Sequence, residues 1–480
     1  MKLNDYVEHD AIGLAELVGK GEVTPAELAD CANAAIEAVN PALNFVAHRI
    51  AEPVQGEPGG PLAGVPFLCK DLVLQIAGVP HRSGTRMLGQ GMFVPPESTE
   101  LFKRFQKLGV QTVALTTTPE FGLNGATEAL VYGGATRNPW DTDRSPGGSS
   151  GGSCAAIAAG VVPIAHGNDG GGSIRIPAAA CGILGLKPSR GRTPVGPGHN
   201  LPLMGLGVEF AMSRSVRDSA LMLDYAQGPE VGALFQIGPP AEPYSQAITR
   251  PPRKLKIALA YDLPGTAAPD PEQREAVLAT ARLMEEMGHE VIEARPEFDG
   301  EMWRATNLTW WKGFTAAGVG GLEQALGITA STEVLEACTL AMAEAGRRLT
   351  AVEYEAALVQ MNMICRALGQ FMEGYDAFLL PTLRHLPVRI GLMDQNDASL
   401  DAAGWHNKIF DIMPYCALFN MTGNPAISIP AGLADSATGA LPVAAQFVGR
   451  YGDEATLLQI ARDIEQARPW AHLRPPVFAA

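Results

Sequence analysis

The stretch RSPGGSSGGSCAA, residues 144–156, brings glycines and serines together directly before an alanine-rich segment. It contains the pattern G-x-S-x-G around Ser149, which is typical of a turn that presents a nucleophilic serine between a strand and a helix. The preceding residues, RNPWDTDRSP, are polar and contain prolines, so they do not form the apolar strand that such a turn needs. A phosphate-binding loop is not supported either, because the G-K-[ST] that completes it is missing. A flexible linker stays open as an alternative, although most linkers do not lead into an apolar helix.

A second glycine-rich stretch, HGNDGGGSIRIPAAACG, covers residues 166–182. Gly170, Gly171 and Gly172 leave the backbone before Ser173 unhindered, so that consecutive amides can turn toward one point. An oxyanion hole requires such an arrangement, and Ser173 would lie beside it. The alternative is a tight turn in which Ser173 caps the following segment.

A nucleophilic serine needs a base, and the sequence offers two. His166 is near Ser173 in the sequence, but no Asp or Glu can be assigned to orient it, which favours a structural histidine. Lys70 follows the apolar residues VPFLC. If it is buried, its pKa falls and the neutral amine can act as a base. The alternative is a surface lysine beside Asp71.

Composition limits the classes of function. The chain has 480 residues, of which 46% are hydrophobic and 18% charged, as in folded globular proteins. A net charge of -15, without a run of Lys or Arg, argues against nucleic-acid binding. The seven cysteines lack CxxC spacing, which is typical of reduced thiols in the cytoplasm. We see no signal peptide and no apolar run that could span a membrane, and therefore expect a cytoplasmic protein that binds neither membrane nor nucleic acid.

Helix and strand signals alternate along the chain. Residues 24–40 begin with a capping box, in which Thr24 and Glu27 satisfy each other's free amides, and continue with one apolar helical face. Residues 98–109 predict a helix that ends at Gly109, followed by a strand, and residues 271–294 repeat this order around Gly288. A further strand is expected at residues 255–260, and helices over most of residues 332–371. This alternation favours an α/β fold with a parallel or mixed sheet.

Three motifs together resemble the amidase signature family of serine hydrolases. They are GVPFLCKD (residues 64–71), GGSSGGS (147–153) and GNDGGGSIRIPAAACGILGLKPSRGR (167–192). The resemblance continues through SRSVRDSALML (213–223), YDAFLLPT (375–382), NMTGNPAISIPAG (420–432) and VGRYGDEATLLQIA (448–461). It implies one large domain over residues 1–480, with a mixed central β-sheet covered by helices on both sides. Within it we expect an N-terminal helical segment at about 1–50 and the signature core at about 60–225.

The resemblance also implies roles for individual residues. Ser173 matches the nucleophile that forms the acyl-enzyme, Ser149 the bridging serine after a cis peptide bond, and Lys70 the base of a Ser-Ser-Lys triad. The amides of Gly170, Gly171, Gly172 and Ser173 match the oxyanion hole. The motif positions that we expect to support the site are Ser150, Asp169 and Arg175, the last through a buried ion pair.

The implied activity is hydrolysis of amides, or of carbamates, without a cofactor or a metal ion. The substrate would be a small molecule, and a homodimer is one option for the assembly. GNDGGGSIRIPA and GLGVEFAMSRSVRD resemble most the 6-aminohexanoate cyclic dimer hydrolases and their broad-specificity relatives. One alternative is an amidotransferase subunit that supplies ammonia to a partner. The other is a catalytically silent binding protein, and the intact Lys70, Ser149 and Ser173 argue against this second alternative.

An aromatic cluster in MWRATNLTWWKGF, residues 302–314, has two interpretations. Its members, Trp303, Trp310, Trp311 and Phe314, could line an apolar substrate pocket. They could equally pack in the core, and the sequence leaves both open.

Overall fold

An eleven-stranded mixed β-sheet forms the centre of the protein in a computed structural model that describes residues 1–89 and 93–480. The strands of this sheet and of a separate two-stranded sheet (β4 and β5) are β1 (Val46–Val54), β2 (Pro66–Lys70), β3 (Gln111–Thr116), β4 (Glu128–Ala129), β5 (Gly134–Ala135), β6 (Ile164–Asp169), β7 (Leu184–Lys187), β8 (Val208–Ser213), β9 (Lys256–Leu259), β10 (Glu290–Glu293), β11 (Ala377–Pro381), β12 (Ala426–Ser436) and β13 (Gly439–Gly449).

The strand order is β1-β3-β2-β6-β8-β7-β12-β13-β11-β9-β10. The neighbours β3, β2 and β6 are parallel, as are β11, β9 and β10, while the strands between these groups and the edge strand β1 pair antiparallel. The helices are α1 (Leu3–Tyr6), α2 (Ala11–Gly19), α3 (Pro25–Leu43), α4 (Glu100–Leu108), α5 (Gly151–Ala158), α6 (Arg175–Cys181), α7 (Val216–Ala226), α8 (Tyr244–Ala247), α9 (Pro271–Glu286), α10 (Gly300–Leu326), α11 (Ala337–Gly346), α12 (Ala351–Glu373), α13 (Ala402–Ile412), α14 (Ala417–Thr422) and α15 (Glu454–Ala467).

Helices cover both faces of the sheet, as β11 illustrates. Successive side chains of a strand point to opposite faces. Ala377 and Leu379 belong to the hydrophobic cluster that includes α9 and α15, whereas Phe378 and Leu380 belong to the cluster that includes α12 and α14. The predicted α/β fold with a mixed, two-sided sheet is therefore confirmed.

Most of the elements expected from the sequence are present. The capping box is formed, since the Glu27 amide donates to Thr24 Oγ1 and the Thr24 amide donates to the Glu27 carboxylate. α4 ends at Gly109, which has a φ of 96°, and β3 follows. α9 is likewise followed by β10. The predicted helical segment at 332–371 consists of two helices, α11 and α12, separated between Gly346 and Ala351.

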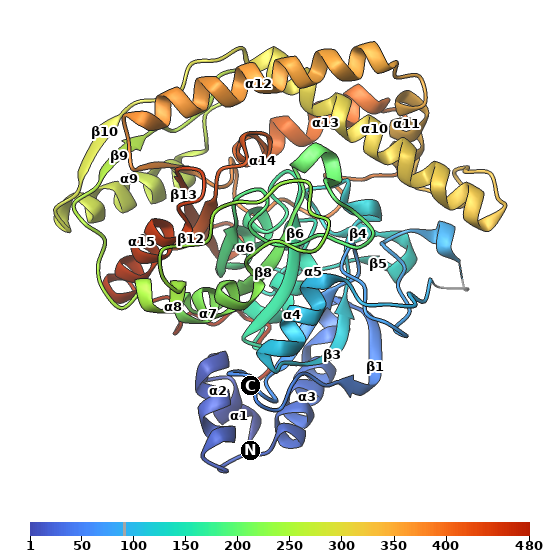
Figure 1. Ribbon diagram of the computed structural model, residues 1–480. Coiled ribbons are helices and arrows are strands. Elements are labelled where there is room, and N and C mark those ends of the chain that lie inside the picture. The colour runs from blue at the N-terminus through green and yellow to red at the C-terminus, as the bar shows by residue number, and fades with distance from the viewer. Residues whose placement is uncertain (90–92) are drawn as a thin grey trace.

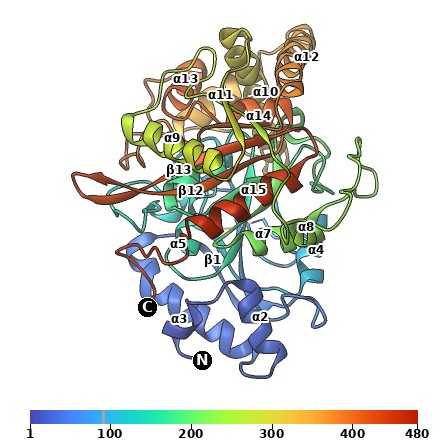
Figure 2. The same ribbon diagram turned by 90° about the vertical axis from the view of Figure 1, so that its left-hand side faces the viewer.

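Two groups of helices lie at opposite ends of the molecule. α1, α2 and α3 lie at one end, and α10 to α13 lie together at the opposite end (Figures 1 and 2). Among the described residues, no helix combines the length and the apolar character needed to cross a membrane.

Candidate active site

The Gly/Ser stretch lies inside the protein. Residues 145–158 are all buried, and α5 begins within the stretch at Gly151. The peptide bond between Gly148 and Ser149 is cis. A Cβ atom on Gly148 would come within 2.9 Å of the Ala126 backbone, so that only glycine fits there without a shift. The flexible-linker interpretation is wrong, because this segment is packed on all sides.

Lys70, the last residue of β2, reaches this stretch from the neighbouring strand. Its side chain is 0% exposed, and its Nζ lies 2.7 Å from Ser149 Oγ. It also donates to Asn168 Oδ1 at 2.5 Å. The alternative of a surface lysine beside Asp71 is therefore wrong.

Burial changes the acidity of Lys70. It lowers the pKa of the ammonium group to about 7, because the charged form loses its hydration, while the carboxyl groups of Glu209 and Asp169 act in the opposite direction. Lys70 therefore holds a substantial fraction of neutral amine at neutral pH. That form can accept a proton from the Ser149 hydroxyl.

His166 on β6 does not face a serine hydroxyl. Its Nδ1 accepts a hydrogen bond from the Lys70 backbone amide at 3.3 Å, so its Nε2 carries the proton and donates to Glu209 Oε2 at 2.9 Å. Burial and the charge of Lys70 hold the pKa of His166 well below its ordinary value. Both ring nitrogens are thus occupied by contacts that fix β2, β6 and β8 to one another.

The loop 170–173 carries Ser173 between β6 and α6. The Gly172 amide donates to Asp169 Oδ1 at 2.7 Å, and Gly172 has a φ of 130°, which favours glycine. Within residues 1–89 and 93–480, the amides of Gly170, Gly171 and Ser173 donate to no protein acceptor. Three free donors and the Ser173 hydroxyl therefore lie on one short loop, and Ser173 is 9% exposed.

A buried ion pair holds this loop. Arg175 at the start of α6 contacts both carboxylate oxygens of Asp169 at 2.9 Å. Burial alone would raise the pKa of Asp169, yet the Arg175 guanidinium holds it well below its usual range. Arg175 donates further to Asn420 Oδ1 and Gln446 Oε1, at 2.6 and 2.7 Å. The loop is thereby fastened to α14 and β13 from the distant C-terminal part of the chain.

Ser150 joins the two glycine-rich stretches. Its amide donates to the Ser173 carbonyl at 3.3 Å, and its hydroxyl donates to the Asn168 carbonyl at the same distance. Lys70 contacts Ser149, and Ser149 and Ser173 line one cavity, so these three residues, which are far apart in the sequence, lie in one region.

Several residues at this site were not predicted from the sequence: Asn168, Glu209, Asn420 and Gln446. Asn168 lies within the second motif and could have been noticed there. Glu209 and Gln446 are polar residues inside apolar strand segments, VEFAMS and ALPVAAQFVG. A lone charged or amide side chain in a buried strand needs a partner, and that was the available signal.

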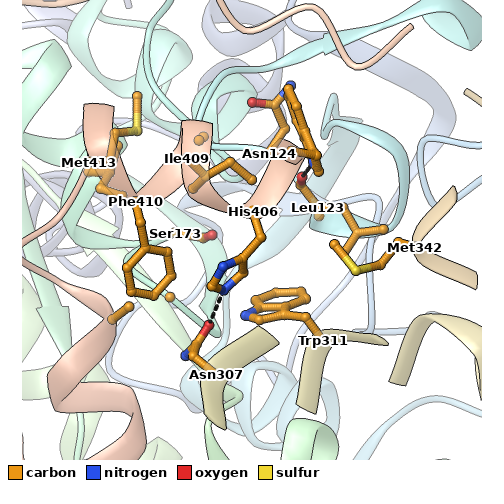
Figure 3. Close-up of a pocket in the computed structure, with 17 residues that line it drawn as sticks. Leu123, Asn124, Ser173, Asn307, Trp311, Met342, His406, Ile409, Phe410 and Met413 are labelled. Carbon is orange, nitrogen blue, oxygen red and sulfur yellow. Dashed lines mark hydrogen bonds between the residues drawn. The ribbon is translucent and has the colours of Figure 1, made fainter. Parts of the chain in front are cut away.

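Two cavities meet at Ser173. The first, which we call the aromatic cavity, contains about 560 Å³ of empty space, part of it open to solvent, and is lined mainly by apolar side chains, including Trp311, Trp405, Phe410, Met342 and Met413 (Figure 3). The second cavity contains about 1010 Å³ of empty space, part of it open to solvent, and is lined among others by Ser149, Asn168, Gly170 and Phe314. Both include Gly122, Ser173 and Trp311 in their walls.

The aromatic cluster on α10 divides between the two interpretations. Trp303 and Trp310 are each 1% exposed and pack in the core, whereas Trp311 and Phe314 line the cavities. The helical repeat explains the different positions of the tryptophans, because residues seven apart share one face and residue 311 lies about 100° from residue 310. Phe314 lies between these two directions, and it both packs against the core cluster and lines the second cavity.

Comparisons with known proteins identify the family of this chain. The Amidase family model matches residues 25–458. A 6-aminohexanoate-cyclic-dimer hydrolase of Pseudomonas sp. (strain NK87) is 34% identical over 98% of this chain and 97% of its own length. A solved structure of a 6-aminohexanoate cyclic dimer hydrolase has a TM-score of 0.91 at 32% identity, covering 98% of this chain and 99% of that chain. A bacterial aryl acylamidase structure has a TM-score of 0.83 at 26% identity, covering 96% and 97%.

The family match and the relative of 34% identity both extend over most of the chain, and the solved structures reproduce its fold. The protein is a hydrolase of carbon–nitrogen bonds and belongs to the amidase signature family.

Proposed function

We propose that the protein hydrolyses amides through an acyl-enzyme on Ser173, with Ser149 and Lys70 as a proton relay. The observation that carries the proposal is the 2.7 Å contact between Lys70 Nζ and Ser149 Oγ in a site where Lys70 has no exposed surface. A neutral lysine there donates one N–H to Asn168 Oδ1 and directs its lone pair at the Ser149 hydroxyl.

The first half of the reaction forms the acyl-enzyme. Ser173 Oγ attacks the amide carbonyl carbon while its proton passes to Ser149 Oγ and the Ser149 proton passes to Lys70 Nζ. The carbon–nitrogen bond then breaks, and the same relay returns a proton to the departing amine. A water molecule next loses its proton along the relay, attacks the ester carbonyl and releases the acid, leaving Ser173 as it began.

The developing oxyanion needs donors beside Ser173. The free amides of Gly170, Gly171 and Ser173 meet this need, and each such donor is worth roughly a hundredfold in rate. The Gly172 amide already donates to the Asp169 carboxylate, so it is not available to the oxyanion. In this proposal Gly172 contributes through its backbone turn, which orients the neighbouring amides.

The substrate class that we propose is small aliphatic amides, cyclic or linear, with carbamates as a second bond type. The similarity to 6-aminohexanoate-cyclic-dimer hydrolases supports this choice. A screen of aliphatic, aryl and peptide amides with carbamates and esters would rank the substrates.

A fluorophosphonate probe tests the nucleophile. Mass spectrometry of the treated protein should find the adduct on Ser173, and Ser173→Ala should lose both the label and the activity. Ser153→Ala is the matched control, because Ser153 lies in the same glycine-rich stretch but donates to the His166 carbonyl, and it should keep the label. Labelling elsewhere, or full activity of Ser173→Ala, would overturn the proposal.

A further inference from the structure

A buried polar pair interrupts the apolar wall of the aromatic cavity. Asn307 on α10 and His406 on α13 both line the cavity, at 0% and 3% exposure. His406 Nε2 and Asn307 Oδ1 lie 3.0 Å apart, and the imidazole stacks on Phe410 with ring centroids 4.4 Å apart. Figure 3 shows this pair beside Trp311 and close to the reactive Ser173.

The contact between the two side chains leaves one polar atom of each unused. Neither His406 Nδ1 nor Asn307 Nδ2 has a hydrogen-bond partner among the described residues. If Nε2 is the protonated nitrogen, Nδ1 is an acceptor and Nδ2 a donor. In the other tautomer, with the amide turned over, Nδ1–H is the donor and the amide oxygen the acceptor. Either way the pair offers one donor and one acceptor to a neighbour.

Buried polar atoms without partners are unusual and need an explanation. Asn124, which also lines the cavity, shows the ordinary case, since its Nδ2 donates to the Met393 carbonyl and its Oδ1 accepts from the Ala126 amide. Asn307 and His406 differ from it in keeping unused capacity in the wall of a cavity that contains the proposed nucleophile. A bound molecule that supplies the missing partners would explain this difference.

The wall of the aromatic cavity is uncharged. Among the residues that the structure describes, no Lys, Arg, Asp or Glu lines it, and burial lowers the pKa of His406 to about 3, with Arg304 and Lys312 adding to the effect. His406 is therefore neutral at physiological pH. A charged group entering this cavity would lose its hydration without gaining a counter-ion, which is strongly unfavourable.

The relay indicates which part of the substrate enters this cavity. Ser149, which returns the proton to the departing amine, lines the second cavity and not the aromatic one. The amine therefore leaves on the side of the second cavity. The acyl part, on the other side of the carbonyl carbon, extends into the aromatic cavity toward Asn307 and His406.

From these observations we infer that the acyl part of the substrate carries, besides the amide that is cleaved, a second uncharged group with one donor and one acceptor. A further secondary amide fits this description, and the Asn307–His406 pair is its binding site. The inference rests on the proposed function, because it uses Ser173 and Ser149 in their proposed roles.

The test uses p-nitroanilides whose acyl chains have equal length but different ends: an alkyl group, an N-methylamide, a carboxylate and an ammonium group. A series of chain lengths covers the distance from Ser173 to the pair. At the best length, the wild-type protein should hydrolyse the amide-ended probe with a kcat/KM about tenfold or more above that of the alkyl probe. Both charged probes should be poorer than the alkyl probe.

Variants test whether the Asn307–His406 pair causes the preference for the amide-ended probe. Asn307→Leu and the double variant Asn307→Leu with His406→Phe should bring the ratio of kcat/KM between the amide-ended and the alkyl probe close to one. Thr306→Val is the matched control. Thr306 precedes Asn307 on α10 and lines neither cavity, and the substitution removes its partly buried hydrogen bond to Gln360 of α12. This variant should keep the wild-type ratio.

The outcomes separate this inference from the proposed function. Suppose that the wild-type protein hydrolyses the alkyl probe, but its kcat/KM for the amide-ended probe is less than twofold higher at every chain length. This result would overturn the inference and leave the proposed function standing. An unchanged ratio in a folded Asn307→Leu protein would do the same. If no probe is hydrolysed and Ser173 takes no fluorophosphonate label, the proposed function fails and the inference fails with it.

Discussion

Lys70 is the residue whose surroundings set the pH range of the proposed reaction. Burial lowers its pKa to about 7, and only the neutral amine can accept the Ser149 proton. We expect kcat/KM to rise with pH through one ionisation near that value and then to level off. A pH–rate profile that stays flat through neutral pH would contradict this role. Lys70→Met should remain folded, as circular dichroism would show, and should be inactive at every pH.

Glu209 provides a second test, in which the direction of the shift in the pH–rate profile is predicted. Burial raises the pKa of the Glu209 carboxyl well above its ordinary value, although the charge of Lys70 acts in the opposite direction. An ionised Glu209 raises the pKa of Lys70, so replacing it with an uncharged group should lower that pKa and move the acidic limb of the profile to lower pH, whereas a Glu209 that is already neutral leaves the limb in place. Glu209→Gln keeps an acceptor for His166 Nε2 and changes mainly the charge. Glu465→Gln is the control, since it alters a carboxyl group on α15 that accepts from the Val216 amide, away from Lys70, and should leave the limb in place. Movement to higher pH in Glu209→Gln would refute the argument.

At the scale of an element, α10 has two faces with different consequences. Trp303 lies in the core, so Trp303→Ala should lower the free energy of unfolding by about 3–5 kcal/mol, measured by urea denaturation. Trp311 lines both cavities, so Trp311→Ala should cost less stability and should change kcat/KM between acyl chains of different size. Equal loss of stability in both variants, with unchanged selectivity, would show that Trp311 is only a packing residue.

The elements also show what the sequence could predict. The capping box of α3 and the glycine at the end of α4 are local signals, so these helices follow from neighbouring residues. The difference between the two faces of α10 cannot be predicted from neighbouring residues. The helical periodicity identifies the apolar positions, but it does not tell which of them pack in the core and which line a cavity. The partnership of His166 with Glu209 depends on the pairing of β6 with β8, which no local signal specifies. The glycine loops, Lys70 and Ser173 were predicted because their chemistry lies in short motifs.

At the scale of the whole molecule, one hydrophobic cluster joins distant parts of the chain. It contains Tyr6 of α1, Phe67 of β2, Leu457 of α15 and Trp470 near the C-terminal end of the sequence. Because these segments share buried contacts, we propose that residues 1–480 unfold as one domain. Tryptophan fluorescence and far-ultraviolet circular dichroism should give coincident transitions in urea. Two separate transitions would divide the chain into independent units.

The aromatic cavity is built from two parts of the chain with separate tasks. The glycine-rich loops and Ser173 come from its first half, whereas α10, α11 and α13 supply most of the side chains that face them. The proposed relay has no member on these three helices. Substitutions there can therefore change which molecules are accepted while the bond-breaking groups stay intact. For an engineer, the cavity-lining positions of α10, α11 and α13 are the ones to randomise, and for evolution they are where new substrates can be gained at little risk to catalysis.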